Sequence, residues 1–153
     1  VQDSSDGGHA APAHTILPGR SARADDGWRT RRRRDGGHDW ITYRLAGQGV
    51  IRAVEIDTAN FHGDAPGWAS LSVRDGDAGG EGGTDGTGGE WVPLVPRVPL
   101  QPDTVHRFLV NQVPATHVRL DIFPDGGIAR LRLHGSLTAR GAAQLAARTA
   151  ALS

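Results

Sequence analysis

Short stretches in which apolar and polar residues alternate recur along this sequence, and they limit the chain to a β-sheet architecture. Residues 39–45 place Ile41, Tyr43 and Leu45 on one side of an extended chain and polar neighbours on the other. A period of two residues turns one face of a strand toward a core and the other toward solvent. The expected strands cover residues 39–45, 50–58, 69–73, 105–110, 116–123 and 128–134.

The last two of these strands form the clearest hairpin in the sequence. They are joined by residues 124–127, Pro-Asp-Gly-Gly, in which proline suits the second position of a tight turn and glycine suits its end. Residues 91–100 are also extended in character, but three prolines remove backbone donors there. We therefore expect this segment at the edge of a sheet or as an extended crossing.

The period changes to that of a helix in the last part of the chain. Thr138 can cap a helix whose apolar stripe contains Ala142, Leu145, Ala146 and Leu152. We expect this helix to pack on the strands or on a partner domain. Many short strands followed by a single helix predict an all-β fold, a jelly-roll β-sandwich with a C-terminal helix.

These elements divide the chain into three parts. Residues 1–14 have the composition of a flexible tail or linker, residues 15–136 form the sandwich, and residues 137–153 form the helix. Residues 75–90 contain eight glycines among sixteen residues and predict a flexible loop within the sandwich. This loop lacks the lysine of a phosphate-binding loop and the repeated copies of a calcium-binding Gly-Asp array.

The overall composition excludes several classes of function. The chain has 17 basic and 17 acidic residues, so no net field favours nucleic acid or a membrane surface. It contains no cysteine, which excludes disulfides and Cys-ligated zinc. We find neither a secretion signal nor a membrane span, and we expect a cytoplasmic protein. Because methionine is also missing, we expect a processed or excised piece of a longer protein.

Three separated segments are rich in side chains that can bind ligands or transfer protons. Residues 27–40 read GWRTRRRRDGGHDW, residues 57–64 read DTANFHGD, and residues 116–130 contain the Pro-Asp-Gly-Gly turn. In this order and at this spacing they resemble the signature of one allantoicase repeat, and the resemblance extends over roughly residues 15–153. Both ends of that stretch are more similar to the second, C-terminal repeat of an allantoicase than to the first.

The resemblance implies a galactose-binding-like sandwich and an enzyme that hydrolyses allantoate to ureidoglycolate and urea in purine and allantoin degradation. Allantoate carries one carboxylate and two ureido groups, so its site needs a guanidinium fork, acceptors for the ureido N–H groups and an acid/base pair. Histidine is the natural acid/base residue near neutral pH. The expected catalytic residues are His38, Asp57 and His117. The expected substrate-binding residues are Arg32, Arg119 and Asp125.

Each of these residues also has a structural interpretation. The run from Arg31 to Arg34 could be a solvated basic face. His38 and Asp39 could form a turn that opens a strand, and Asp125 is also a turn residue. The four tryptophans are more typical of core or interface packing than of stacking platforms for a planar ureide.

The sequence departs from the family pattern at three positions. Arg29 stands where an allantoicase repeat usually has glutamate, Asn60 where it has histidine, and Asp64 where it has asparagine. These changes affect side chains capable of proton transfer or ureido hydrogen bonding. They indicate either a repeat that keeps the fold while its own pocket has drifted, or a site re-tuned by the neighbouring His62 and Asp64.

Two functions therefore stay open. The first is an allantoicase domain that acts on a small-molecule ureide, alone or completed by a sister repeat, and that assembles as a homo-oligomer. The alternative is a non-catalytic galactose-binding-like module that binds carbohydrate or peptide, or that supports a sister catalytic repeat. No cofactor is predicted, because no pair of histidines has the spacing of metal ligands on one element, and a divalent metal is thus not supported.

Overall fold

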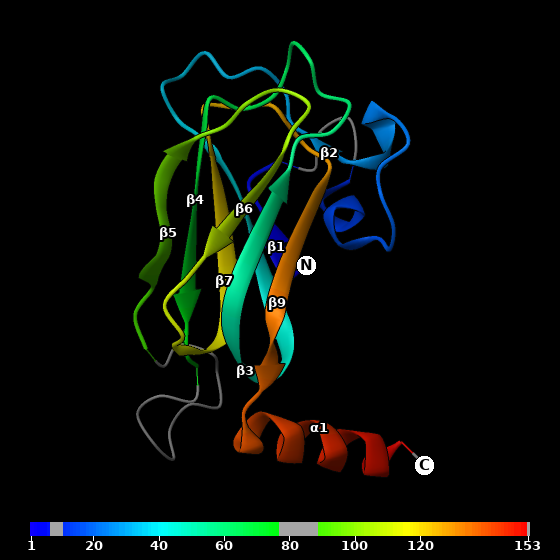
Figure 1. Ribbon diagram of the computed structural model, residues 1–153, viewed down its shortest axis with the longest axis vertical. Coiled ribbons are helices and arrows are strands. Elements are labelled where there is room, and N and C mark those ends of the chain that lie inside the picture. Colours follow the sequence, from blue (N-terminus) through cyan, green and yellow to red (C-terminus); the bar gives the residue numbers. More distant parts are fainter. Residues whose placement is uncertain (7–10, 77–88, 153) are drawn as a thin grey trace.

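One long strand, β3, runs through both layers of the fold in the computed structural model, which describes residues 1–6, 11–76 and 89–152. The first half of β3 pairs antiparallel with β7, and its second half pairs with β9 on one side and β6 on the other. The two layers of Figure 1 are thus β1, β3, β7, β4 and β5 in one, and β9, β3 and β6 in the other. The elements are β1 (Asp3–Ser4), η1 (Pro12–Ile16), η2 (Ala24–Asp26), β2 (Trp28–Arg29), β3 (Asp39–Asp57), β4 (Trp68–Arg74), β5 (Val92–Pro99), β6 (Val105–Leu109), β7 (Pro114–Phe123), β8 (Gly127–Ile128), β9 (Arg130–Leu137) and α1 (Ala139–Ala151).

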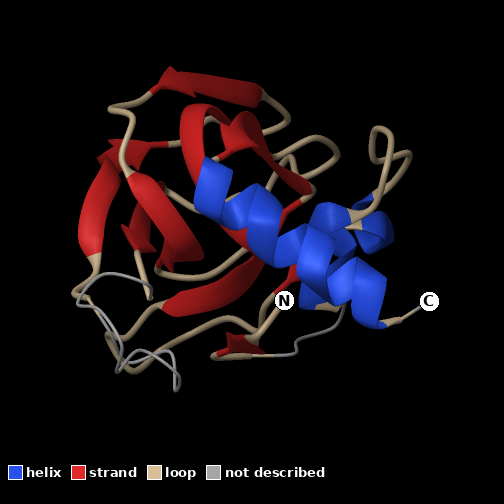
Figure 2. Cartoon of the chain, turned by 90° about the horizontal axis from the view of Figure 1, so that it is seen from below, coloured by secondary structure: helices blue, strands red, loops and turns tan. Residues whose placement is uncertain are grey.

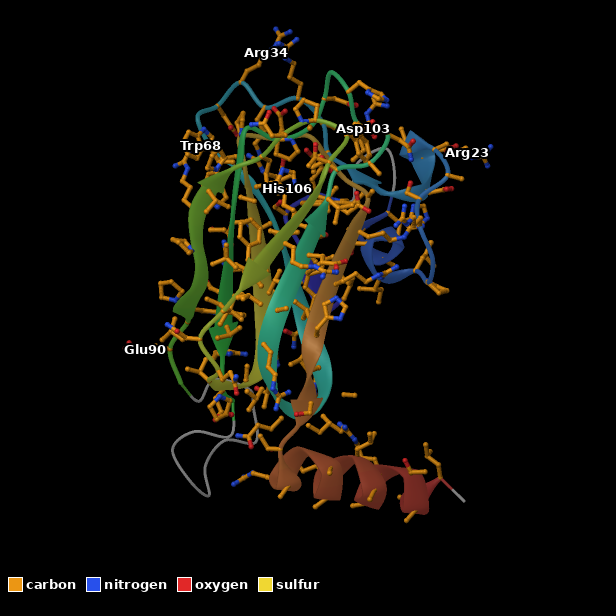
Figure 3. All side chains as sticks on the ribbon, viewed as in Figure 1. Arg23, Arg34, Trp68, Glu90, Asp103 and His106 are labelled. Carbon is orange, nitrogen blue, oxygen red and sulfur yellow. The ribbon has the colours of Figure 1, made fainter. Side chains whose placement is uncertain are left out.

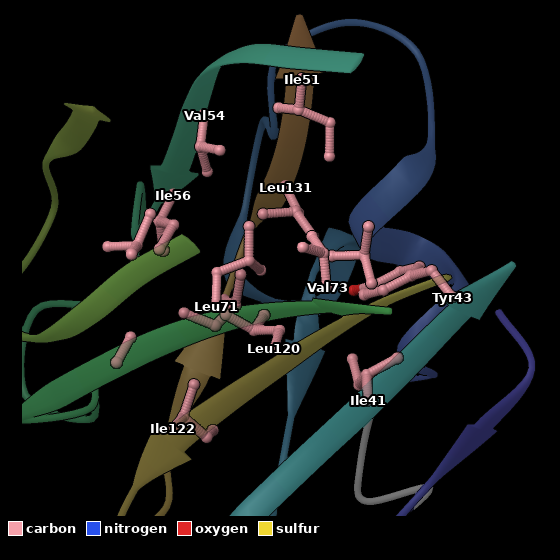
Figure 4. Close-up of a cluster of buried hydrophobic side chains, with 14 of the residues drawn as sticks. Ile41, Tyr43, Ile51, Val54, Ile56, Leu71, Val73, Leu120, Ile122 and Leu131 are labelled. Atoms are coloured by element: carbon pink, nitrogen blue, oxygen red, sulfur yellow. The ribbon is translucent and has the colours of Figure 1, made fainter. Parts of the chain in front are cut away.

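The core lies between these layers and consists of the alternating apolar residues that the sequence marks. Ile41 lies opposite Leu120 on β7, and Leu120 lies opposite Leu71 on β4, so one row of side chains crosses the first layer. The second layer contributes Val54 and Ile56 from β3 (Figure 4). All five of these side chains are fully buried. The predicted all-β sandwich with a C-terminal helix is therefore confirmed.

Strand β3 differs from the sequence prediction, which placed two strands at 39–45 and 50–58. The backbone stays extended through the glycine-containing stretch between them, and the pairing with β7 shifts register between Arg44 and Gly49. This irregularity lets one strand leave the first layer and enter the second. The prolines of 91–100 do lie in an edge strand, because β5 ends the order of its sheet.

The first described residues of the chain pair with the sandwich. Strand β1 pairs with β3 through Asp3 opposite Thr42 and Ser4 opposite Ile41, and η1 follows at Pro12–Ile16. These contacts are made largely by backbone groups, which small polar residues supply as well as any others. Of the predicted glycine-rich loop, residues 77–88 lie outside the described residues.

Helix α1 lies below the strands in Figure 1 and in front of them in Figure 2, which is seen from below, and its one buried residue, Gly141, is in its first turn. Thr138 caps this turn by accepting a hydrogen bond from the Gly141 amide at 3.0 Å. Gly141 is buried, and a Cβ there would lie 2.0 Å from the Gln48 carbonyl oxygen, so only glycine allows this approach. The predicted apolar stripe does not pack on the sandwich, since Ala142 and Ala146 are exposed. Among the described residues, no helix is long and apolar enough to cross a membrane.

Candidate functional site

The three signature segments meet at one end of the sandwich, the upper end in Figure 1. The Ala129 amide donates to the Asp57 carbonyl oxygen at 2.7 Å, and the Gly127 amide donates to that of Asp64 at 2.9 Å. Arg29 on β2 pairs with Gly127 on β8. Backbone hydrogen bonds thus hold the segments together, and the side chains that they carry point into different environments.

A carboxylate on β7, Asp121, holds two of the predicted site residues. Its Oδ2 lies 2.7 Å from His38 Nε2, and Arg119 Nε donates to its Oδ1 at 2.9 Å. The side chains of Arg119 and Asp121 share the outward face of β7 because they are two residues apart. Asp121 lies between Trp40 on β3 and Ser70 on β4, and its side chain is only 12% exposed. This carboxylate therefore faces an imidazole and a guanidinium in a largely desolvated position.

Aromatic rings fix the orientation of these groups. The His38 ring stacks on Phe123 with centroids 4.4 Å apart, and the Arg119 guanidinium lies 4.8 Å from the centre of the Trp40 ring. Arg97 covers Phe123 at 4.1 Å. Stacking on a ring face restricts how an imidazole or a guanidinium can rotate. Trp68 lies nearby at this end of the molecule, on the surface (Figure 3).

A separate group of charges lies in the segment before β3. Arg33 donates its amide to Asp125 Oδ2 at 2.6 Å and its Nε to Asp39 Oδ1 at 2.9 Å. Ser5 donates to the same Asp39 oxygen, whereas Asp39 Oδ2 is buried without a hydrogen-bond partner among the described residues. The bond to Asp39 raises the pKa of the Arg33 guanidinium above its ordinary value. We name the contacts of His38 and Arg119 with Asp121 the Asp121 network; the contacts of Arg33 with Asp39 and Asp125 are separate from it, because Asp39 lies opposite the core residue Ile122 and so faces the other side of the sheet.

The other layer carries a hollow of about 300 Å³ whose wall is rich in arginine. Asp57 lies in this wall, and its Oδ1 accepts a hydrogen bond from the Ala59 amide at 2.8 Å. We name this feature the arginine hollow. It is lined by Gly19, Arg20, Glu55, Asp57, Val105, Arg107, Arg130 and Arg132.

The structure brings together two of the six predicted site residues. His38 and Arg119 belong to the Asp121 network, whereas Asp125 accepts from the Arg33 amide and Asp57 lines the arginine hollow. His117 is buried on the same face as Asp121 but four residues earlier on β7, about 13 Å along the strand. Arg32 is exposed and makes no ion pair with the described residues. The described residues thus do not place all six side chains in one cleft, and their catalytic roles stay predictions.

The positions that depart from the family pattern make local structural contacts. Arg29 Nε lies 3.2 Å from Asp64 Oδ2, so two of the departures form an ion pair with each other. Asn60 Nδ2 donates to the Ser21 carbonyl oxygen at 2.9 Å, and its backbone has a φ of 71°, which asparagine tolerates well. These side chains stabilise the loops of this end.

Asp121, the carboxylate of the network, and Arg33, which holds Asp39 and Asp125, were not among the predicted site residues. A signal for Asp121 exists in the sequence, since it lies two residues after Arg119 on the same face of an alternating strand. Arg33 had no such signal, because four successive arginines in an irregular segment give no indication of direction. Among the described residues, no three His, Asp or Glu side chains gather closely enough to hold a metal ion, and cofactor dependence stays a prediction.

Comparison with solved structures defines the class of fold. A carbohydrate-binding module of a family 31 glycoside hydrolase from Clostridium perfringens matches with a TM-score of 0.64 and covers 88% of each chain, at 8% sequence identity. A structure described as that of an allantoicase matches with a TM-score of 0.74 at 30% identity, over 88% of this chain and 39% of the other. The yeast allantoicase from Saccharomyces cerevisiae gives a TM-score of 0.75 at 30% identity, over 87% and 39%. The fold is therefore the β-sandwich that such modules and allantoicases share.

Sequence comparison then defines the family. The profile of the allantoicase repeat matches residues 1–138. A probable allantoicase from Streptomyces coelicolor is 55% identical over 149 residues, which cover 97% of this chain and 37% of that protein. One from Streptomyces avermitilis is 54% identical over the same shares. The chain belongs to the allantoicase family, and it spans little more than a third of the length of these relatives.

Proposed function

We propose that this chain is one repeat of an allantoicase and takes part in the hydrolysis of allantoate to ureidoglycolate and urea in purine degradation. The observation that carries the proposal is the 55% identity to a probable allantoicase over 97% of this chain. The carbohydrate-binding alternative is not favoured, because the matching carbohydrate-binding modules share only the fold with this chain, at 8 to 16% identity. We also propose a cytoplasmic location and assembly with a sister repeat in a homo-oligomer.

The Asp121 network supplies groups suited to this chemistry. Asp121 holds His38 through Nε2, which orients the imidazole so that its Nδ1 can exchange a proton with the leaving ureido nitrogen or with the attacking water. Arg119 offers guanidinium donors for the substrate carboxylate, and Trp40 fixes the plane of that guanidinium. Water supplies the oxygen for the central carbon, the C–N bond breaks, and urea leaves with the transferred proton.

A sister repeat is part of the proposal because this repeat does not gather all the predicted groups by itself. His117 and Asp57 lie away from His38, and the three departures from the family pattern form structural contacts instead of lining the network. The active unit is then the longer protein, to which this repeat contributes the Asp121 network.

Urea release from allantoate tests the proposal. The 153-residue chain is compared with a protein that joins it to a second allantoicase repeat, and Arg119→Ala is introduced into the joined protein. We expect activity in the joined protein and a fall in kcat/KM of about a hundredfold on substitution, since a charge-assisted contact to the substrate is lost. Arg148→Ala, an exposed arginine on α1, is the matched control. Unchanged kcat and KM in Arg119→Ala would exclude the Asp121 network from the reaction.

A further inference from the structure

A buried guanidinium, that of Arg130, lies in the wall of the arginine hollow and forms no close ion pair with the described residues. Arg130 is 4% exposed, and the described residues place no carboxylate within ion-pair distance of its guanidinium. Its Nε donates to the Gly19 carbonyl oxygen at 3.1 Å, and its Nη1 donates to those of His14, Asp26 and Ala129. These carbonyl dipoles hold the guanidinium in place, and the Asp26 carboxylate acts on it only at longer range, where the charge of Arg130 helps to lower the pKa of that carboxyl.

The other charges around the hollow add to the positive charge of Arg130. Four guanidinium groups and two carboxylates line it. Glu55 is already engaged, because Arg107 donates both Nε and Nη2 to its Oε1, and this contact lowers the pKa of the Glu55 carboxyl. Asp57 is therefore the only lining carboxylate that has no arginine on it within the described residues. The field inside the hollow is positive.

Several donors remain available to a molecule in the hollow. Arg20 is exposed and makes no hydrogen bond or ion pair with the described residues. Arg132 donates Nη2 to the carbonyl oxygens of Leu17 and Gly19, which fixes its guanidinium plane beside the opening. The guanidinium groups of Arg107 and Arg132 are thus pre-oriented by protein acceptors, an arrangement that lowers the entropy lost when an anion binds.

We propose that the arginine hollow is a binding site for a small oxyanion, a carboxylate or an inorganic phosphate. Its volume of about 300 Å³ fits a ligand of this size. A planar or tetrahedral oxyanion accepts paired hydrogen bonds from guanidinium forks, and it offsets the excess of guanidinium groups over carboxylates in the wall. The proposal does not depend on the proposed catalytic function, because Arg119 and His38 belong to the other layer.

The test is an NMR titration of the ¹⁵N-labelled 153-residue chain with sodium malonate, with phosphate and with allantoate, each at constant ionic strength. We expect saturable shifts at the amides of Gly19, Arg20, Val105 and Arg107. If allantoate gives saturable shifts at the same amides and malonate displaces it, the oxyanion that binds in the hollow is the carboxylate of the substrate. Saturation by phosphate or malonate, with allantoate silent, identifies a separate effector anion.

Substitutions of the two partners of the Arg107–Glu55 ion pair are expected to change the affinity in opposite directions. Arg107→Gln removes a guanidinium and is expected to weaken malonate binding about tenfold. Glu55→Gln removes a competing carboxylate and releases Arg107, so it is expected to strengthen binding several-fold. Arg148→Gln on α1 is the control and should leave the affinity unchanged, and thermal unfolding verifies that each variant is folded. Shifts that do not saturate, or that are equal in all of these variants, would overturn the proposal, whatever the outcome of the urea assay.

Discussion

The Asp121 network and the arginine hollow lie in different layers of the same sandwich, and they compensate charge in opposite ways. In the network, a largely buried carboxylate is shared by an imidazole and a guanidinium at 2.7 and 2.9 Å. In the hollow, a buried guanidinium is held by four backbone carbonyl groups. Side-chain partners can exchange protons or turn toward a ligand, whereas carbonyl groups can only fix a cation in place. The first region is thus suited to proton transfer and the second to holding an anion.

The largest effect is expected from removing the buried cation of the hollow. Arg130→Gln should lower the free energy of unfolding by about 3 kcal/mol, because four carbonyl groups lose their donor and the segments that contain His14 and Asp26 lose their anchor. Denaturant unfolding measures this change. Arg132→Gln is the matched control, since that arginine is only partly buried and should cost about 1 kcal/mol or less. Equal losses in the two variants would show that burial of Arg130 has no special role.

Substitution of Asp121 in the network is expected to destabilise the fold less than Arg130→Gln does, but it should also reduce activity. Asp121→Asn leaves His38 and Arg119 without their shared negative charge, so stability should fall by about 1 to 2 kcal/mol. In a two-repeat protein, kcat should fall about ten- to hundredfold, because the imidazole loses the group that orients it. The same substitution should also change the ¹⁵N chemical shifts of the His38 ring. If His38 had only a structural role, this change would not be accompanied by a loss of kcat.

Ser70→Ala is the neighbour control for this prediction. Ser70 lies opposite Asp121 on β4 and makes no charged contact with the described residues. Its substitution should change neither kcat nor stability appreciably. A variant Asp121→Asn with wild-type kcat and KM would remove Asp121 from the mechanism and leave it a structural residue.

The two regions also differ in how far the sequence predicts them. The alternation of residues 39–45 and 116–123 is enough to place Ile41 and Leu120 in the core, and these do pair across β3 and β7. The contact between His38 and Asp121 joins residues 83 positions apart, and no spacing along the chain indicates it. Family resemblance supplied His38 and Arg119 as candidates, but not the carboxylate between them.

The hollow was harder to predict, for a physical reason. Its wall takes Glu55, Arg107 and Arg132 from three different strands, and their proximity follows from the register of β3 with β6 and β9. Alternation shows which face of a strand is outward, but it does not show which strands are neighbours. The contacts of the first six residues have no sequence signal for a related reason, since the contact between the Asp6 carbonyl oxygen and Trp28 Nε1 uses a backbone group that every residue has.

The smallest predicted effect is on the free energy of unfolding, and it comes from the Glu55–Arg107 ion pair in the wall of the hollow, whose strength depends on pH. The hydrogen bond from Arg107 lowers the pKa of the Glu55 carboxyl in the folded protein. Because the folded-state pKa is lowered, the Glu55 carboxylate contributes its full stability at pH values above its unfolded-state pKa, about 4.3. This contribution is lost as the pH falls through the lower folded-state pKa. Glu55→Gln should therefore reduce the free energy of unfolding at pH 7 by less than about 1 kcal/mol, because Arg107 is 69% exposed and solvent screens the pair.

Denaturant unfolding of Glu55→Gln and the unsubstituted chain between pH 7 and pH 3 measures this difference. It should be constant from pH 7 to about pH 5 and shrink below that, as the carboxyl of the unsubstituted protein takes up a proton. Adding malonate at pH 7 should narrow the difference, since the variant binds the anion more tightly and gains more stability from it. A difference that is independent of both pH and malonate would mean that Glu55 acts through packing alone, and that the guanidinium groups of the hollow are not competing for negative charge.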